Sequence, residues 1–298
     1  MPRNVLSQDD LSDVRRIAAR CLGRLASVEP IPSQQNIVCR LRMADGARRI
    51  IKLAPKRRSR SRRTARSDES VAREPDAYRR LAAAGLPAPR IHCGESAGGH
   101  FGRAWFVCDD LGRRTAADSS GLSPTSRRRL YGQMGRLLAK IHATPVEGES
   151  TALTPLMSWQ RDQIRRGLAG DLYRDDALSA ALESLDHDTP VGRLGFCHGD
   201  FHAAQCIRRG GRLVAAVDWE SAHIGDPGRD HAVFETMVRI TAPAELAQSA
   251  LDAYAEASPF FDAAAYADVR IAHAAALVVA FNDARRHAYA RAARSLLK

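Results

Sequence analysis

The chain of 298 residues is 45% hydrophobic with a formal net charge of +11, which fits one large or two modest globular domains with a buried core. No apolar run reaches the roughly 18 residues of a membrane-spanning helix, and residues 1–4 lack the apolar stretch of a signal peptide, so we expect a cytoplasmic protein without a membrane span. The six cysteines show no C-x-x-C pairing, which favours reduced thiols over zinc ligands or disulfides.

The positive charge is concentrated in the first part of the chain. Residues 1–110 contain 22 Lys and Arg against 12 Asp and Glu, whereas residues 111–298 contain 23 against 22. The segment 52–66 holds eight positive residues and no acid. Because the run 57–66 has no apolar face and repels itself, it is predicted to be a mobile, exposed loop. A clamp on phosphate or an anionic substrate, a contact with acidic lipid or nucleic acid, and a serine phosphorylation site remain alternatives.

The first half of the chain predicts a leading helix followed by strands. The helix is expected at 6–25 and the strands at 26–31, 36–43, 49–53, 90–93 and 104–108. Asp45-Gly46 is typical of a hairpin turn between the second and third strands. A further helix opens at Arg73-Glu74-Pro75. Because proline is tolerated mainly in the first helical turn, this helix either begins near Glu74 or is kinked there.

The second half is predicted to be mostly helical. Apolar residues at helical spacing predict an amphipathic helix at 126–142, and the polar segment 145–192 is expected to be mostly helical. The Ala-rich segment 264–297 predicts a terminal helix or helical pair. Two short apolar strands, at 195–197 and 213–217, interrupt this helical part.

Those two strands each lead to an acidic residue. The first runs into the turn His198-Gly199-Asp200, and the second is followed by Asp218. Between them, Gly210-Gly211 is typical of a two-residue hairpin turn, so we expect Asp200 and Asp218 at the ends of adjacent strands, close to one another. Two carboxylates suit phosphoryl transfer, in which one acid accepts the proton of the attacking hydroxyl and another holds magnesium on the phosphates.

Taken together, His198-Gly199-Asp200, Asp218-Trp219-Glu220 and the later Gly225-Asp226-Pro227 resemble the aminoglycoside phosphotransferase and choline kinase family of small-molecule kinases. The resemblance implies an α+β fold of the protein-kinase-like, bilobal type. A small antiparallel β-sheet would form the nucleotide-binding N-terminal lobe, residues 1–108. A larger, mainly helical C-terminal lobe, residues 109–298, would carry catalysis and substrate binding.

The resemblance also implies roles for single residues. Asp200 would be the catalytic base, and Lys52 would contact the nucleotide phosphates while paired with Glu74. Asp218 and Gln205 would hold Mg²⁺, with Gln205 at the position where the family usually has Asn. Its amide oxygen is the same type of ligand on a longer side chain.

Three further residues of these motifs are expected to have structural roles. Asp226 and Asp230 are predicted together to cap the helix that follows and to brace the catalytic turn. His198 is predicted to brace that turn by hydrogen bonding rather than to donate a proton.

The function implied is transfer of phosphate from ATP (or GTP) to a hydroxyl group of a small molecule such as an antibiotic, a sugar or an amino alcohol. A nucleotide and a small hydroxylated acceptor are therefore the expected partners, and nucleic acid is not. The alternative is a non-catalytic regulator that keeps the fold and binds an anionic partner through its Arg-rich segment. Intact Lys52, Glu74, Asp200 and Asp218 argue against a regulator, while Gln205 and Pro75 argue for it. The acceptor and the oligomeric state are left open.

Overall fold

The computed structural model describes residues 6–33, 36–56, 62–96, 99–146, 194–258 and 264–280, together with residues 162, 163, 165 and 262. It divides into two compact units. The first comprises residues 1–112 and the short segment 218–220, and the second comprises residues 113–217 and 221–298. The first unit therefore extends a few residues past the predicted boundary at 108 and also takes in Asp218.

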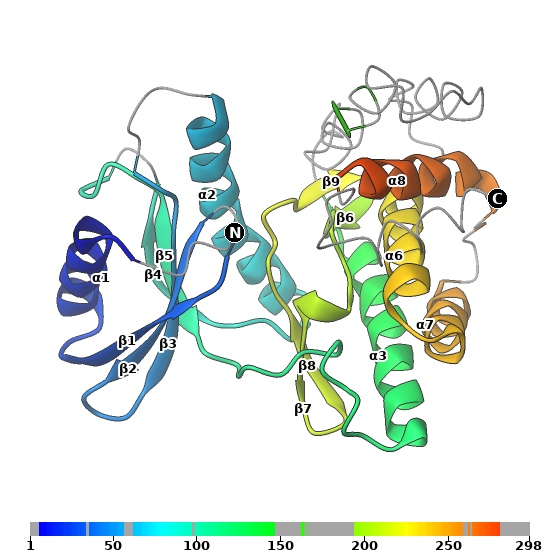
Figure 1. Cartoon of the computed structure of the whole chain (residues 1–298), viewed down its shortest axis with the longest axis horizontal. Helices are drawn as coiled ribbons and strands as arrows, with labels where there is room; N and C mark the ends of the chain where they lie inside the picture. Colours follow the sequence, from blue (N-terminus) through cyan, green and yellow to red (C-terminus); the bar gives the residue numbers. More distant parts are fainter. Residues whose placement is uncertain are drawn as a thin grey trace. The chain divides into compact units, whose positions relative to one another are not determined.

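The first unit is built on a five-stranded antiparallel sheet (Figure 1) with strand order β1-β2-β3-β5-β4. Its strands are β1 (Leu25–Ile31), β2 (Ile37–Met43), β3 (Arg48–Leu53), β4 (Ile91–Glu95) and β5 (Trp105–Asp109). The predicted turn at Asp45-Gly46 is present, with Gly46 at a φ of 85°. All five predicted strands are thus confirmed, with ends shifted by one or two residues.

The two faces of this sheet are covered by different helices. The leading helix α1 (Gln8–Cys21) is capped by Ser7 and buries Val14 and Ile17 against a core that includes Ile51 and Val107. Because side chains alternate across a strand, Lys52 and Phe106, a cross-strand pair, lie on the opposite face. Tyr78 of α2 (Arg62–Ala83) contacts Phe106 on that face.

Helix α2 corrects one expectation and excludes one of the two alternatives for Pro75. It begins at Arg62, so residues 62–66 of the Arg-rich run are helical rather than loop, while residues 57–61 lie outside the described residues. Arginine favours helix, and extending an existing helix adds one hydrogen bond for each residue fixed. The helix also continues through Pro75 rather than beginning near Glu74. The side chains that α2 buries, such as those of Val71 and Leu81, lie on both sides of the proline.

The second unit is mainly helical in its described part. Helix α3 (Pro124–His142) packs against α7 (Ala244–Ala257), and α6 (Pro227–Thr241) packs against α8 (Ala267–Ala280). The predicted helix at 126–142 is therefore confirmed. Only the first part of the predicted terminal helix, α8, is described, and almost all of 145–192 lies outside the described residues.

Four short strands of the second unit form two separate two-stranded sheets. They are β6 (Gly195–Cys197), β7 (Cys206–Arg209), β8 (Arg212–Ala216) and β9 (His223–Gly225). The hairpin at Gly210-Gly211 joins β7 to β8, as predicted. The strand before Asp200, however, pairs with β9 and not with the strand before Asp218, so the expected adjacency of those two strands is wrong. The 3-10 turn η1 (Ala203–Gln205) separates β6 from the hairpin.

Two buried histidines make the stability of this unit pH-dependent. Burial lowers the pKa of His231 and of His273 to about 3, from an ordinary value of 6.5. Below pH 6.5 these two histidines therefore take up protons in the unfolded chain but not in the folded chain. The free energy of unfolding decreases as the pH falls further. We expect the melting temperature to drop between pH 7 and pH 4.5. In His231→Phe the drop in melting temperature should be smaller than in wild type. An equal drop in the variant and in wild type would show that His231 is not a cause of the pH dependence.

Candidate active site

Lys52 lies at the centre of a partly buried cluster of charged side chains in the first unit. Its Nζ forms an ion pair with Oε1 of Glu74, lies 2.7 Å from Oδ1 of Asp218 and lies 2.5 Å from Oε1 of Glu220. The Lys52 side chain is 8% exposed and that of Glu74 only 1%. The predicted pairing of Lys52 with Glu74 is therefore present, and the structure adds two further carboxylates to it.

The cluster has one cation for three carboxyl groups, and this affects the pKa of Lys52 and of Glu74. Burial alone would lower the pKa of Lys52, but Asp218, Glu74 and Glu220 together raise it well above its ordinary value. Burial raises the pKa of Glu74 more than the charge of Lys52 lowers it. Repulsion by Asp218 and Glu220 raises it further, and the pKa of Glu74 is about 7. Lys52 thus stays charged at neutral pH, while Glu74 can gain or lose a proton there.

The segment 218–220 is held by α2 and by the start of β2. The phenol oxygen of Tyr78 accepts a hydrogen bond from the backbone N–H of Asp218 at 3.3 Å, and Arg73 donates to the carbonyl of Glu220 at 2.7 Å. The amide of Asn36 donates to Oε1 of Glu220. These contacts explain why the three residues belong to the first unit although the chain on either side belongs to the second.

Sequence reasoning assigned no role to Glu220 or Tyr78. For Glu220 a signal was present, since it is the acid two residues after Asp218 in a motif already recognised. For Tyr78 no signal existed, because a tyrosine on the apolar side of a helix is most often a core residue.

In the second unit, Asp230 holds the turn that carries Asp200. Its carboxylate accepts hydrogen bonds from the backbone N–H groups of His198, at 2.7 Å, and Gly199, at 2.9 Å. Burial would raise the pKa of Asp230, but its hydrogen bond and charge interaction with His142 lower it to about 2. The side chain of Asp226 accepts a hydrogen bond from the backbone N–H of Gly228 at the start of α6. The bracing role of Asp230 and the capping role of Asp226 are confirmed.

Glycine is required within this turn. Gly199 has a φ of 83°, and a Cβ atom there would lie 2.5 Å from the carbonyl oxygen of Ser221. The backbone N–H of the next residue, Asp200, donates a hydrogen bond to Nδ1 of His198. Because Nδ1 accepts, the proton of the imidazole is on Nε2, which donates to the carbonyl of Val217 at 3.1 Å. The predicted bracing role of His198 is therefore also confirmed.

Asp200 itself is accessible. Its side chain is 40% exposed, and its Oδ1 lies 3.8 Å from Nε2 of His202. Gln205 is half-buried at the end of η1, and its carbonyl accepts the N–H of Val217 at 2.9 Å. Both His198 and Gln205 are thus bonded to Val217, the residue that directly precedes Asp218.

The residues present fit a divalent cation bound through oxygen. Within the part of the chain that the structure describes, Glu74, Asp218 and Glu220 form a group in which each offers a carboxylate oxygen within 4.8 Å of the others. Carboxylate and amide oxygens are the ligands that Mg²⁺ prefers. A second group, His142, Cys197 and Asp230, is tied up in bracing hydrogen bonds such as the 3.0 Å contact between His142 and Asp230.

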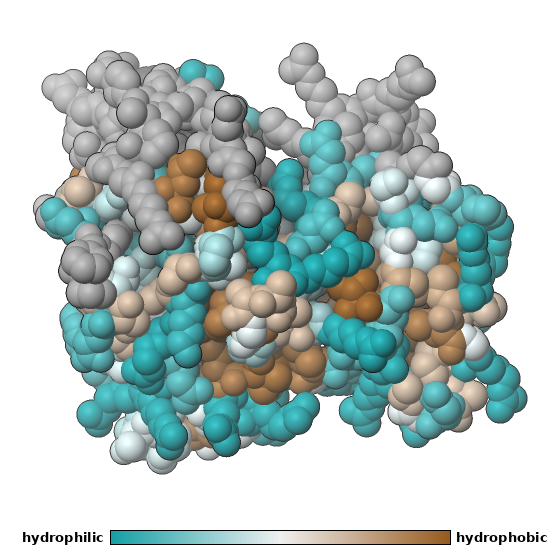
Figure 2. Space-filling model, turned by 180° about the vertical axis from the view of Figure 1, so that it is seen from behind, coloured by the Kyte–Doolittle hydropathy of each residue, from teal (hydrophilic) through white to brown (hydrophobic). Residues whose placement is uncertain are grey.

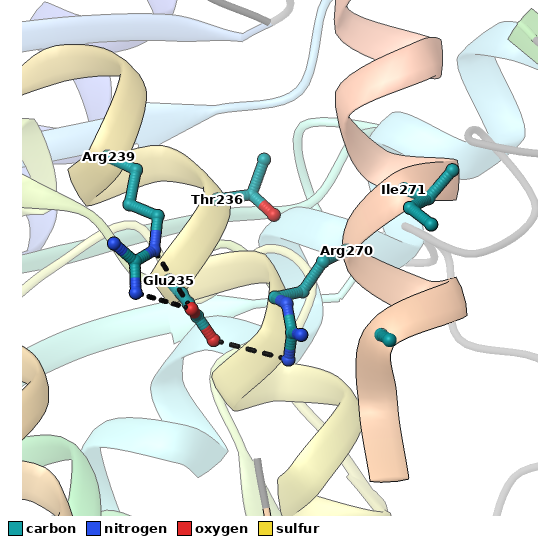
Figure 3. Close-up of a pocket in the computed structure, with 6 residues that line it drawn as sticks. Glu235, Thr236, Arg239, Arg270 and Ile271 are labelled. Atoms are coloured by element: carbon teal, nitrogen blue, oxygen red, sulfur yellow. Dashed lines mark hydrogen bonds and ion pairs between the residues drawn. The ribbon is translucent and has the colours of Figure 1, made fainter. Parts of the chain in front are cut away.

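A cavity of about 370 Å³ lies between α6 and α8 in the second unit (Figure 3). Glu235 forms ion pairs with Arg239 on its own helix at 2.9 Å and with Arg270 of α8 at 3.4 Å. None of the predicted site residues lines this cavity. The ion pairs connect the two helices, and we assign them that structural role.

The five-stranded sheet with its buried Lys–Glu pair, and the helical unit with its braced His-Gly-Asp turn, define an α+β phosphotransferase fold of the kinase-like type. The model of the phosphotransferase enzyme family matches residues 27–271. The chain therefore belongs to this family, and the predicted fold class is confirmed. No match was found among the curated proteins.

Several solved structures share the fold over nearly the whole chain. A putative aminoglycoside phosphotransferase from Ralstonia eutropha JMP134 is 16% identical, with a TM-score of 0.64 and coverage of 97% of this chain and 96% of that one. A thermostable mutant of aminoglycoside phosphotransferase APH(4)-Ia, in a ternary complex with AMP-PNP and hygromycin B, is 15% identical, with a TM-score of 0.65 and 96% coverage of both chains. Macrolide 2'-phosphotransferase type I is 20% identical, with a TM-score of 0.61 and 98% coverage of both. At these identities the likeness establishes the fold alone.

None of the helices in the described residues is long and apolar enough to cross a membrane. On the face shown in Figure 2, hydrophilic residues separate the hydrophobic ones into limited areas.

Proposed function

We propose that this protein is an ATP-dependent phosphotransferase that phosphorylates a hydroxyl group of a small molecule. The observation that carries the proposal is the cluster around Lys52, in which Lys52 and Glu74 are buried and Asp218 and Glu220 are partly exposed. A buried ion pair such as Lys52–Glu74 contributes little to stability, because desolvation offsets most of the attraction. A cluster of this kind, in a chain of the phosphotransferase family, is better explained by binding of the phosphates of a nucleotide.

Each residue of the proposal has a distinct task. Lys52, oriented by Glu74, holds the phosphate oxygens of the nucleotide. Asp200 accepts a hydrogen bond from the acceptor hydroxyl, orients its oxygen and takes its proton as the new bond to phosphorus forms. Asp218 and Gln205 would hold Mg²⁺, and Glu220 is a further candidate ligand. Bound there, Mg²⁺ would neutralise charge on the phosphates.

The acceptor is proposed at the level of a chemical class. The structures with the same fold include enzymes named for aminoglycosides and for macrolides, both of which carry hydroxyl groups. A hydroxylated antibiotic, a sugar and an amino alcohol are therefore the acceptors to test first. ATP is the proposed donor, with GTP as the alternative nucleotide.

The test is release of ADP that depends on both Mg²⁺ and an acceptor. The purified protein should be incubated with ATP and Mg²⁺ against a panel of aminoglycosides, macrolides, sugars and amino alcohols. Stimulation of ADP release by members of one chemical class would support the proposal. Failure to bind nucleotide, together with no turnover on any acceptor, would contradict it and favour a non-catalytic regulator.

Gln205 gives a separate prediction about the metal. If its amide oxygen is a ligand, Gln205→Ala should raise the Mg²⁺ concentration needed for half-maximal activity, because one oxygen donor is lost. Gln205→Asn should retain measurable activity, since the same amide oxygen is present on a side chain one methylene shorter. Titration of both variants with Mg²⁺ at saturating ATP measures this effect. An unchanged metal requirement in the alanine variant would remove Gln205 from the site.

A further inference from the structure

Tyr78 connects two of the proposed functional residues through a single oxygen atom. Its hydroxyl donates a hydrogen bond to Oε2 of Glu74 at 3.3 Å and accepts one from the backbone N–H of Asp218 at 3.3 Å. The other carboxylate oxygen of Glu74 pairs with Lys52, and Lys52 contacts Asp218 at 2.7 Å. The four residues therefore form a closed ring of contacts, all within the first unit.

The conformation of Asp218 requires such support. With a φ of 67°, it is the one non-glycine residue among those described that has a left-handed backbone. This conformation is unfavourable for residues that carry a Cβ atom, and less so for aspartate. It persists only when neighbouring groups hold it in place. The hydrogen bond from its N–H to Tyr78 fixes the backbone at this residue, and the contact with Lys52 orients the side chain.

Packing does not account for the hydroxyl of Tyr78. The residue is 3% exposed, and its ring packs edge-on against Phe106 with ring centroids 6.2 Å apart. A phenylalanine would make the same ring contact. Placing a hydroxyl in this buried position costs free energy unless it is hydrogen-bonded. The Tyr78 hydroxyl is hydrogen-bonded to Glu74 and to Asp218, which are both residues of the proposed site.

We propose that Tyr78 is a positioning residue that holds Asp218 in its metal-binding conformation and couples it to Glu74 on α2. This inference rests on the proposed function. Because Tyr78 is itself a residue of α2, the affinity of Asp218 for a cation would depend on the position of that helix. Tyr78 would contact neither the nucleotide nor the acceptor.

The test is Tyr78→Phe, which keeps the ring and removes only the oxygen. The primary measurement is the affinity for ADP by calorimetry, with and without Mg²⁺, because it needs no acceptor. We expect the strengthening of ADP binding by Mg²⁺ to fall by about tenfold, the order of effect that one buried hydrogen bond supports, while affinity for ADP without metal changes little. The matched control is Tyr131→Phe, which removes a hydroxyl from a buried tyrosine of α3 in the second unit.

The outcomes separate this inference from the function on which it rests. Equal enhancement by Mg²⁺ in wild type and Tyr78→Phe would overturn the inference and leave the function standing. A fall in Tyr78→Phe with no fall in Tyr131→Phe would support it, whether or not an acceptor has been found. A parallel loss of ADP affinity with and without metal would show a general structural role and overturn it. Wild-type protein that binds no nucleotide would overturn both proposals.

Discussion

Asp200→Asn is expected to lower turnover by about 10²–10⁴-fold, the usual contribution of a positioned general base. The substitution keeps the size and shape of the side chain and removes its ability to accept a proton. The turn should stay intact, because its backbone is held by Asp230 and His198. Nucleotide binding should be unchanged, since Lys52 and its carboxylate partners are untouched.

The measurement is the steady-state rate with a responsive acceptor, together with ADP affinity for each variant. Asp76→Asn serves as the control, because Asp76 is an exposed acid of α2 that pairs with Arg79 in a surface contact. Its turnover should equal that of wild type. Wild-type turnover in Asp200→Asn would remove Asp200 from the role of base.

Lys52→Ala is expected to lower kcat/KM for ATP by at least about 10²-fold, the order seen when a preorganised donor to a reacting oxygen is removed. It should also destabilise the first unit, because three carboxyl groups then lie together without their cation. Breaking a buried ion pair costs roughly 3–5 kcal/mol when the remaining charge cannot be neutralised. Here the cost should be smaller near neutral pH, because the pKa of Glu74 is already about 7 and the group can take up a proton.

Glu74→Gln tests this explanation. Glutamine keeps the shape of the side chain and removes its charge, so the double variant should lose less stability than the sum of the two single variants. Lys56→Ala is the matched control, because Lys56 is an exposed lysine that pairs with Asp13 outside the cluster. Simple additivity of Lys52→Ala and Glu74→Gln in unfolding measurements would show that the two side chains are not energetically coupled.

The parts of the fold that could be predicted are those with local signals. Strand alternation and the turns at Asp45-Gly46 and Gly210-Gly211 depend on residues close in sequence, and the structure has both hairpins. The pairing of Lys52 with Glu74 and the bracing by Asp230 came from recognised motifs rather than from periodicity.

The parts that could not be predicted depend on contacts between distant segments. The partner of the strand before Asp200 is β9, a strand of three residues that carries no recognisable strand pattern. Tyr78 and the N–H of Asp218 are 140 residues apart, so no spacing rule connects them. The start of α2 at Arg62 differs from the predicted loop, because extending a helix that packing already stabilises outweighs the repulsion among its arginines.

Following the terminal phosphate of ATP distinguishes a phosphotransferase from a non-catalytic regulator. With γ-³²P-labelled ATP, Mg²⁺ and an acceptor that stimulates ADP release, we expect label in the acceptor, in a bond stable to alkali as expected for a phosphate ester. The labelled amount should match the ADP formed, and it should fall with Asp200→Asn. Label found only in inorganic phosphate, with none in any acceptor of the panel, would contradict the account.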